Sequence, residues 1–151
     1  MQEPPKGWPR MVSSIFYDDA AAAIDWLVRA FGFEVQLKIE GEGGRIEYSQ
    51  LVYGGGQVTI GQADPSRPGR AFAASPRSAG GHNTQAVCVC VDDADAMCAR
   101  ARAAGGVISV EPTTIDYGDD YWSDRTCEVI DPEGHHWWFM QRLRDKDTGG
   151  A

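Results

Sequence analysis

The apolar residues of this chain recur with two periodicities, helical spacing and strand alternation, and the order of these segments predicts the secondary structure. Residues 20–31 carry apolar side chains at helical spacing, which indicates a helix with one apolar stripe. Residues 33–40 alternate between apolar and polar side chains, as a half-buried strand does. Further strands are predicted at 11–17, 45–53 and 57–62, so the first part of the chain has the order strand, helix and three strands.

This pattern occurs a second time further along the chain. A shift of 74 positions lays residues 18–20 on residues 92–94, and both triplets read Asp-Asp-Ala. Aspartate is a good N-cap, and its charge suits the positive end of a helix dipole, so each triplet predicts the start of a helix. The second copy predicts a helix at 94–104 and strands at 86–91, 107–115, 123–130 and 135–142.

Each copy is therefore a βαβββ module, and the predicted fold class is α+β. A helix protects only one face of a four-stranded sheet, so the other face must meet the sister module or enclose a ligand. Two modules paired in this way would form a half-open barrel with a cleft. The predicted organisation is an extended lead-in at 1–10, a first module at 11–62, an inter-module loop at 63–82, a second module at 83–142 and a tail at 143–151.

Length and charge exclude several classes of partner. The 151 residues suit one domain, or two half-domains that share a core. A net charge of −8 and a pI of about 4.7 argue against nucleic acid, since no basic stripe is present to neutralise phosphates. The acidity could favour a cationic ligand, although solubility alone accounts for it. No apolar run approaches the roughly 18 to 20 residues of a membrane helix, so we expect no membrane partner.

The cysteines and the amino terminus bear on the cellular compartment. The four cysteines, Cys88, Cys90, Cys98 and Cys127, form neither a C-x-x-C motif nor a dense disulfide scaffold. The amino-terminal residues lack the basic and then apolar segments of a signal peptide. These features predict reduced thiols and a cytoplasmic location. A reactive thiol would need a neighbouring cation or helix amino terminus, so Cys88 and Cys90 are interpreted as small inward-facing hydrophobes.

Two features of the modules together resemble a known superfamily. An Asp-Asp pair follows the first strand of each module, and the sequence Asp-Pro-Glu-Gly-His at 131–135 precedes the last strand. This order resembles the vicinal oxygen chelate superfamily over residues 11–142. Its members include glyoxalase I, extradiol dioxygenases, methylmalonyl-CoA epimerase, fosfomycin-resistance enzymes and bleomycin-resistance proteins. The resemblance implies the glyoxalase/bleomycin resistance fold and a homodimer, in which one site draws its modules from one chain or from two.

The resemblance also locates the positions where enzymes of this superfamily hold a divalent metal. They use four inward side chains, two in each module, and these are His, Gln or Glu. The patterns H-x-x-x-x-V-x-D and D-P-x-G-N-x-x-E carry over to Val12, Ala86 and Trp138, and a shift of 78 positions carries Trp138 to Ile60. None of these side chains can bind a metal, and a one-residue slip would bring in only glutamines. We therefore expect no metal and no cofactor.

His135 and His136 look like a metal-binding pair, but neighbours on a strand point to opposite faces and cannot hold one ion together. His136 shares its face with Trp138 and Met140, and is predicted to point into the cleft. It is the candidate general base, although the sequence shows no fixed partner for it. Contact with a ligand, or a hydrogen-bonded place in the core, is the alternative for His136.

Aromatic residues are the most suggestive group in the second module. By alternation, Trp137 and Phe139 are predicted to pack under the helices, whereas Trp138 lines the concave wall. Aromatic faces beside the acidic residues of 119–124 could hold a cation, or the rings could simply fill the barrel. An apolar cleft with a few polar groups is a default site for a small molecule. The predicted ligand-binding residues are Phe16, Tyr48, Ile60, Gln62, Cys88, Trp122, His136, Trp138 and Met140.

These observations lead to three hypotheses for function. The preferred one is a metal-free, glyoxalase-like binding protein of the bleomycin-resistance kind, a homodimer that sequesters an aromatic or cationic small molecule. The second is an enzyme of the same fold, of the lyase, isomerase or dioxygenase type, which acts without metal or with non-standard ligands. His136 or an acidic loop residue would be its base. The third is a metal enzyme whose ligands lie in another register.

Overall fold

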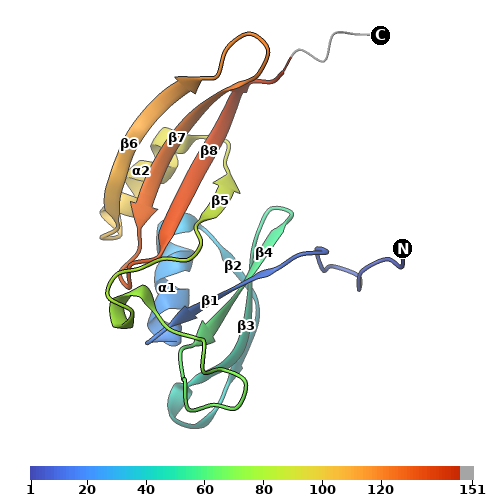
Figure 1. The fold of residues 1–151 in the computed structure, drawn as a ribbon, viewed down its shortest axis with the longest axis vertical. Helices are drawn as coiled ribbons and strands as arrows, with labels where there is room; N and C mark the ends of the chain where they lie inside the picture. The colour runs from blue at the N-terminus through green and yellow to red at the C-terminus, as the bar shows by residue number, and fades with distance from the viewer. Residues whose placement is uncertain (147–151) are drawn as a thin grey trace. The chain divides into compact units, whose positions relative to one another are not determined.

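The computed structural model describes residues 1–146, which fall into two compact units. The first unit spans Met1–His82, and the second begins at Asn83 (Figure 1). The elements of the first unit are β1 (Ser13–Tyr17), α1 (Ala20–Phe31), β2 (Glu34–Glu40), β3 (Ile46–Tyr53) and β4 (Gly56–Gln62). Those of the second are β5 (Val87–Cys90), α2 (Ala94–Ala103), β6 (Val107–Asp116), β7 (Ser123–Ile130) and β8 (His136–Arg144). Short 3-10 helices lie at Glu42–Gly44 and Pro76–Ser78.

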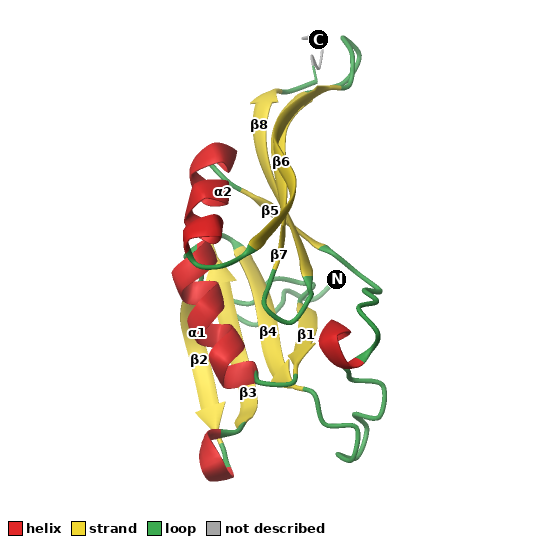
Figure 2. Cartoon of the chain, turned by 90° about the vertical axis from the view of Figure 1, so that its left-hand side faces the viewer, coloured by secondary structure: helices red, strands yellow, loops and turns green. Residues whose placement is uncertain are grey.

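Both units build the same mixed, four-stranded sheet. The strand order is β1-β4-β3-β2 in the first unit and β5-β8-β7-β6 in the second. In each sheet the first and last strands of the module run parallel, and the other neighbours run antiparallel. Each helix packs on one face of the sheet of its own unit (Figure 2). The predicted α+β class with two βαβββ modules is therefore confirmed.

Each helix begins at its Asp-Asp pair, as predicted. Asp19 Oδ1 accepts a hydrogen bond from Ala22 N at 3.0 Å, and Asp93 Oδ1 accepts one from Ala96 N at 2.9 Å. These bonds satisfy amide groups that a helix leaves free at its amino terminus. At the other end of α1, Gly32 has a φ of 75°, the left-handed conformation that ends a helix and that glycine adopts at little cost.

A glutamine at the end of each parallel strand pair makes a second contact with the start of the helix. Gln62 Oε1 accepts a hydrogen bond from Ala20 N at 3.4 Å, and Gln141 Oε1 accepts one from Ala94 N at 3.1 Å. Gln62 also donates to the carbonyl of Asp18. Each glutamine thus ties its strand to the amino terminus of the helix, and the two lie 79 positions apart in the sequence.

The helix-covered face of the second sheet carries the core of its unit. Trp137 and Phe139 are fully buried there, which confirms the prediction that they pack under the helix. Trp137 Nε1 donates to Asp131 Oδ2 at 3.1 Å, and Asp131 Oδ1 accepts from the amides of Glu133 and His135 at 3.0 Å. Asp131 is itself buried, so one carboxylate closes the turn before β8 and also satisfies the indole of the core.

The last strand runs two residues beyond its predicted end. Arg144 pairs with Asp116 at 2.7 Å and donates to the carbonyls of Tyr121 and Gly118, each at 3.1 Å, so the loop after β6 holds the end of β8. The rest of the predicted tail, from residue 147, lies outside the described residues. Within residues 1–146, no helix has the length and apolar character needed to cross a membrane.

Candidate ligand-binding surface

Each sheet has one face covered by its helix and one open face, and the open faces carry most of the residues of functional interest. Because partners in register share a face, strand pairing defines the members of each face. We call the uncovered side of the second sheet the second open face. Its members include Cys88 and Cys90 of β5, His136, Trp138, Met140 and Arg142 of β8, and Asp124, Thr126 and Glu128 of β7.

Trp138 is the largest side chain of the second open face. It lies between Cys88 of β5 and Glu128 of β7, and 38% of its surface is exposed. Cys90 and Met140 form the next pair along the same two strands. An exposed indole flanked by polarizable sulfur atoms is a suitable surface for an aromatic ligand. The structure therefore brings three predicted site residues, Cys88, Trp138 and Met140, onto one surface.

The thiol of Cys88 is not activated as a nucleophile. Its pKa is raised above the ordinary value, first by burial of the sulfur among its neighbours and then by Cys90 and Asp124, although the residue as a whole is exposed. The pKa of the buried Cys127, on the other side of the sheet, is raised to about 12, mainly by burial. Because the thiolate is the nucleophile, a raised pKa keeps both cysteines unreactive at neutral pH.

His136 lies at the start of β8, where it pairs with Ile130 of β7. Its backbone amide donates to Asn83 Oδ1 at 3.4 Å, and Asn83 Nδ2 donates to the carbonyl of Gly134 at 2.8 Å. The imidazole itself has no hydrogen-bond partner in the described part of the chain. A general base must be held within reach of the proton that it takes, and no neighbour orients His136 in that way.

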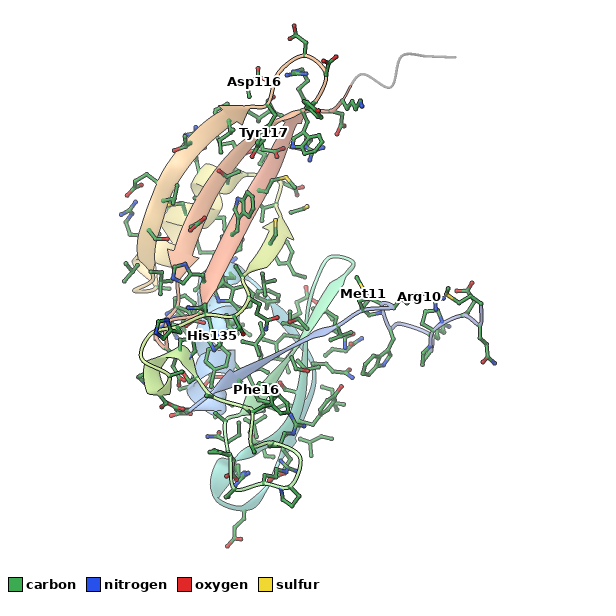
Figure 3. All side chains as sticks on the ribbon, viewed as in Figure 1. Arg10, Met11, Phe16, Asp116, Tyr117 and His135 are labelled. Atoms are coloured by element: carbon green, nitrogen blue, oxygen red, sulfur yellow. The ribbon has the colours of Figure 1, made fainter. Side chains whose placement is uncertain are left out.

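The predicted site residues of the second unit do not form one cluster. Figure 3 shows His135 at one end of the sheet and Asp116 and Tyr117 at the other. His136 and Arg142 are six positions apart on β8, which corresponds to roughly 20 Å along a strand. His136 and the aromatic loop at Trp122 therefore lie at opposite ends of the second open face.

The acidic, aromatic loop after β6 is filled by the chain itself. The guanidinium of Arg142 lies over the Trp122 ring, 5.1 Å from its centroid, and Nε binds Asp124 Oδ1 at 2.6 Å. Tyr117 and Tyr121 pack against the same indole, with ring centroids 5.7 and 6.0 Å away. Arg142 thus occupies the ring face and the carboxylate that we expected a cationic ligand to use.

The uncovered side of the first sheet carries hydroxyl and amide groups. Thr59 Oγ1 donates to Ser14 Oγ at 2.8 Å, and Gln50 Nε2 donates to Tyr48 Oη at 2.9 Å. Gln57 lies on the same side of β4 as Thr59; it is buried, and neither atom of its amide has a partner within residues 1–146. What we call the first open face consists of these residues and Phe16.

Phe16 lies at the edge of the first open face, where the loop at 63–82 folds back over it. Its partner on β4 is Gly61, and a Cβ there would come within 3.1 Å of the Phe16 ring, so the glycine makes room for the ring. Phe72 packs edge-on against Phe16 with centroids 5.7 Å apart, and the Arg70 guanidinium lies 5.2 Å from the Phe16 centroid. The loop therefore covers this end of the first open face.

Ile60 and Gln62 do not lie on the first open face, and the prediction of their orientation is wrong. Ile60 pairs with Ile15 on the helix-covered side and is fully buried. Val58, two positions before Ile60 on β4, is buried with the same parity. Gln62 is engaged with the start of α1. Thr59, which lies between Val58 and Ile60 on β4, has its side chain on the first open face.

The turn between β7 and β8 has one residue more than the turn between β3 and β4, and this difference accounts for the error. Leu51 pairs with Val58, seven positions on, across the β3–β4 turn, whereas the equivalent pair of the second sheet is eight positions apart. A shift of 78 positions therefore relates β3 to β7, but β4 and β8 need a shift of 79. The residue equivalent to Trp138 is Thr59. The glutamines that end the two parallel strand pairs obey the same shift, and they were the sequence signal that could have fixed the register.

Comparison with known proteins assigns the chain to a family. The sequence model of the Glyoxalase/Bleomycin resistance protein/Dioxygenase superfamily matches residues 10–139. The chain belongs to this superfamily. The uncharacterized protein Mb0911c of Mycobacterium bovis is 32% identical over 137 residues, which make up 91% of this chain and 86% of that protein. The uncharacterized protein Rv0887c of Mycobacterium tuberculosis has the same identity over 91% of this chain and 76% of its own length.

Solved structures share the fold of this superfamily member. TioX from Micromonospora sp. ML1 is 34% identical and superposes with a TM-score of 0.69, covering 90% of this chain and 100% of TioX. TnmS3 from Streptomyces sp. CB03234, described as an antibiotic binding protein, is 22% identical with a TM-score of 0.60, covering 87% of this chain and 93% of TnmS3.

The residues at the metal positions of the superfamily enzymes do not fit a divalent ion in this member. With the corrected register, these positions are Val12, Thr59, Ala86 and Trp138. Two carry aliphatic side chains and one an indole, and the Thr59 hydroxyl is bonded to Ser14. Such side chains do not replace imidazole and carboxylate ligands. In addition, no three His, Cys, Asp or Glu side chains gather as a metal site among residues 1–146.

Sequence reasoning missed three residues of the two open faces. Glu128 lies beside Trp138, and alternation along β7 could have placed it there. Gln57 carries a buried amide without a partner in the described residues, and the error in the register of β4 concealed it. Arg142 covers the ring of Trp122, and no local sequence pattern announces this contact.

Proposed function

We propose that this superfamily member is a small-molecule-binding protein of the bleomycin-resistance kind, which sequesters an aromatic ligand without a metal. One observation carries the proposal: where the superfamily enzymes have a glutamate ligand, this chain has the exposed Trp138 on an open sheet face. An indole has no lone pair to offer a divalent ion, but it stacks well on an aromatic ring. Contact by shape thus replaces metal coordination.

The family supports a binding role. TnmS3, which has the same fold, is described as an antibiotic binding protein, and the superfamily description names bleomycin resistance proteins. Binding by shape requires no oriented acid or base. This requirement is compatible with an imidazole at His136 that no neighbour among residues 1–146 orients and with a Cys88 thiol whose pKa is raised.

The second open face favours a flat, largely apolar ligand. Met140 offers polarizable, apolar contact next to Trp138, and Glu128 offers a carboxylate on the other flank of the indole. A hydroxyl or amide N–H at the edge of the ligand could donate to Glu128. A cationic ligand would have to displace Arg142 from Trp122, so we favour an aromatic ligand over a cationic one.

The test is a ligand screen by thermal shift, followed by affinity measurements on matched variants. Trp138→Ala removes the proposed stacking surface. Trp8→Ala removes a tryptophan of nearly the same exposure, 39%, from the lead-in. A ligand of the proposed kind should lose about 2 kcal/mol of binding free energy, or about 30-fold in affinity, in Trp138→Ala and nothing in Trp8→Ala. Equal affinity in Trp138→Ala and the parent would contradict the proposal.

Metal-free binding has its own test, which is elemental analysis of the purified protein. Stoichiometric nickel, zinc, manganese or iron that survives dialysis would contradict this part of the proposal. We also propose a homodimer in the cytoplasm, and light scattering measures the oligomeric state directly.

The enzymatic alternative makes a different prediction for the same ligands. If a bound compound is turned over, and turnover is lost in His136→Ala while Trp138→Phe retains it, a catalytic role with His136 as base replaces the binding role. If the compound binds and stays chemically unchanged, the binding role holds. Product analysis by mass spectrometry after prolonged incubation separates the two outcomes.

A further inference from the structure

Three sulfur-bearing side chains occupy neighbouring positions of the second open face. Cys88 and Cys90 are two positions apart on β5, and both are exposed, free thiols. Met140 pairs with Cys90 on the neighbouring strand. Alternate residues of a strand lie about 7 Å apart and neighbouring strands about 5 Å apart, so side chains from these positions can converge on one ion.

Space and charge next to Cys90 and Met140 suit a small cation. A hollow of about 520 Å³ is lined by Cys90 and Met140, together with Asp92, Arg142 and Asp145. The guanidinium of Arg142 is itself paired with Asp145 at 2.9 Å, which offsets its charge. The carboxylate of Asp92 leaves a further negative charge at the hollow, and this field favours a cation.

The chemistry of the three ligands selects a soft metal. Thiolate and thioether sulfur atoms prefer Cu(I) to hard ions such as Mg²⁺. We propose that Cys88, Cys90 and Met140 form a binding site for a soft monovalent metal cation, of which Cu(I) is the one that fits these ligands. The ion takes two thiolates and one thioether, and the two thiol protons leave when it binds.

This site is separate from the four metal positions of the superfamily enzymes, which carry no sulfur in this chain. It shares the second open face with the proposed aromatic ligand, but that proposal rests on the indole of Trp138, whereas this one rests on the three sulfur atoms. Either proposal can therefore fail without the other.

The test uses the full-length, reduced protein under argon, with Cu(I) alone as the probe and a chromophoric Cu(I) chelator as the competitor. We expect one tightly bound Cu(I) per chain and a sulfur-to-copper absorption band in the near ultraviolet. Changes to residues that merely support metal ligands cost about 10- to 100-fold in affinity, so Cys88→Ser and Cys90→Ser should each cost more than roughly 100-fold. Met140→Leu, which removes only the thioether, should cost roughly 10-fold.

Two control variants remove sulfur elsewhere in the chain. Cys98→Ala removes a buried thiol of α2, and Met11→Leu removes an exposed thioether of the lead-in, so both should bind Cu(I) like the parent. Thermal melts of every variant verify that it folds. The proposal is overturned if the parent fails to bind Cu(I), if a Cys88→Ser/Cys90→Ser double variant binds like the parent, or if Cys98→Ala loses as much affinity as Cys88→Ser.

Discussion

The two open faces belong to the same fold but carry different chemistry. Thr59 and Trp138 occupy equivalent positions, as do Gly61 and Met140, so the first face carries a hydroxyl and a glycine under the Phe16 ring where the second carries an indole and a thioether. The devices that build each module are the same in both, namely the aspartate cap and the strand-end glutamine. The modules thus differ at open-face positions, which the fold constrains least. We therefore expect ligand binding to concentrate on the second open face.

A second pair of equivalent positions shows what the faces still share. Gln57 and His136 both stand two positions before the Thr59 and Trp138 pair, and both carry a polar side chain without a hydrogen-bond partner within residues 1–146. Gln57 is buried, whereas His136 is half-buried. A buried, unpaired amide costs free energy, so this position of the first module carries a penalty that the second avoids.

The largest expected effect tests the register on which the comparison of the faces depends. Ile60→Ala should lower the free energy of unfolding by about 2–5 kcal/mol, because Ile60 is fully buried beneath α1. Thr59→Ala should cost less than about 1.5 kcal/mol, because it removes only an exposed hydrogen bond to Ser14. Urea denaturation measures both values. A larger loss of unfolding free energy in Thr59→Ala than in Ile60→Ala would mean that Ile60, and not Thr59, is the residue equivalent to Trp138.

The next effect concerns the turns before the last strands, which differ in their means of closure. Asp131 accepts hydrogen bonds from the indole of Trp137 and from two turn amides, whereas the turn of the first module consists of glycines 54–56. Asp131→Ala leaves buried donors unpaired and should cost at least about 2 kcal/mol of unfolding free energy. Asp131→Asn retains an acceptor and should cost less. The Trp137 Nε1–H resonance in the NMR spectrum should shift in both variants, and an unchanged resonance would contradict the assigned bond.

Most of the fold could be predicted from the sequence because its signals are local. The apolar stripe of residues 20–31 and the Asp19 cap predicted a helix where α1 is found, at Ala20–Phe31. Alternation along β8 placed Trp137 in the core and Trp138 on the open face, as observed. Both inferences need only spacing within one element and the physics of a single helix or strand.

The rest could not be predicted because it depends on contacts between elements. The faces of β4 were assigned through the other module, and one residue of difference in turn length reversed them. Thr59 gave no warning, since a lone threonine suits either face of a strand. The place of Arg142 over Trp122 depends on the path of the loop after β6, which no periodicity encodes.

A smaller effect tests whether the repeated glutamines do the same work in both modules. Gln62→Ala and Gln141→Ala should each cost about 1 kcal/mol, because each removes a hydrogen bond to the first amide of a helix. Hydrogen exchange should accelerate at Ala20 in the first variant and at Ala94 in the second. Gln50→Ala, which loses a bond to Tyr48 only, is the control and should leave both amides protected. Acceleration in one module alone would show that the glutamines are not equivalent.

The smallest expected effect is a loss of stability in acid that involves α2 and not α1. Arg125 of β7 donates to both carboxylate oxygens of Asp95 in the first turn of α2, whereas the equivalent residue of α1 is Ala21. This hydrogen bonding holds the pKa of Asp95 below its ordinary value of 3.8. A depressed pKa in the folded state stabilises the protein above the unfolded-state pKa, and the gain is lost as the pH falls through the folded-state value.

Asp95→Asn should therefore lower the unfolding free energy slightly at neutral pH, since the ion pair is exposed, and the difference from the parent should vanish in strong acid. Urea denaturation of both proteins over a series of pH values down through the folded-state pKa of Asp95 follows this convergence. Ala21→Asn makes the matched change in α1, where the parent residue carries no charge, so its difference from the parent should stay constant with pH. If the difference in unfolding free energy between Asp95→Asn and the parent also stayed constant with pH, the contact between Asp95 and Arg125 would not depend on the carboxylate charge. The two modules would then not differ in this respect.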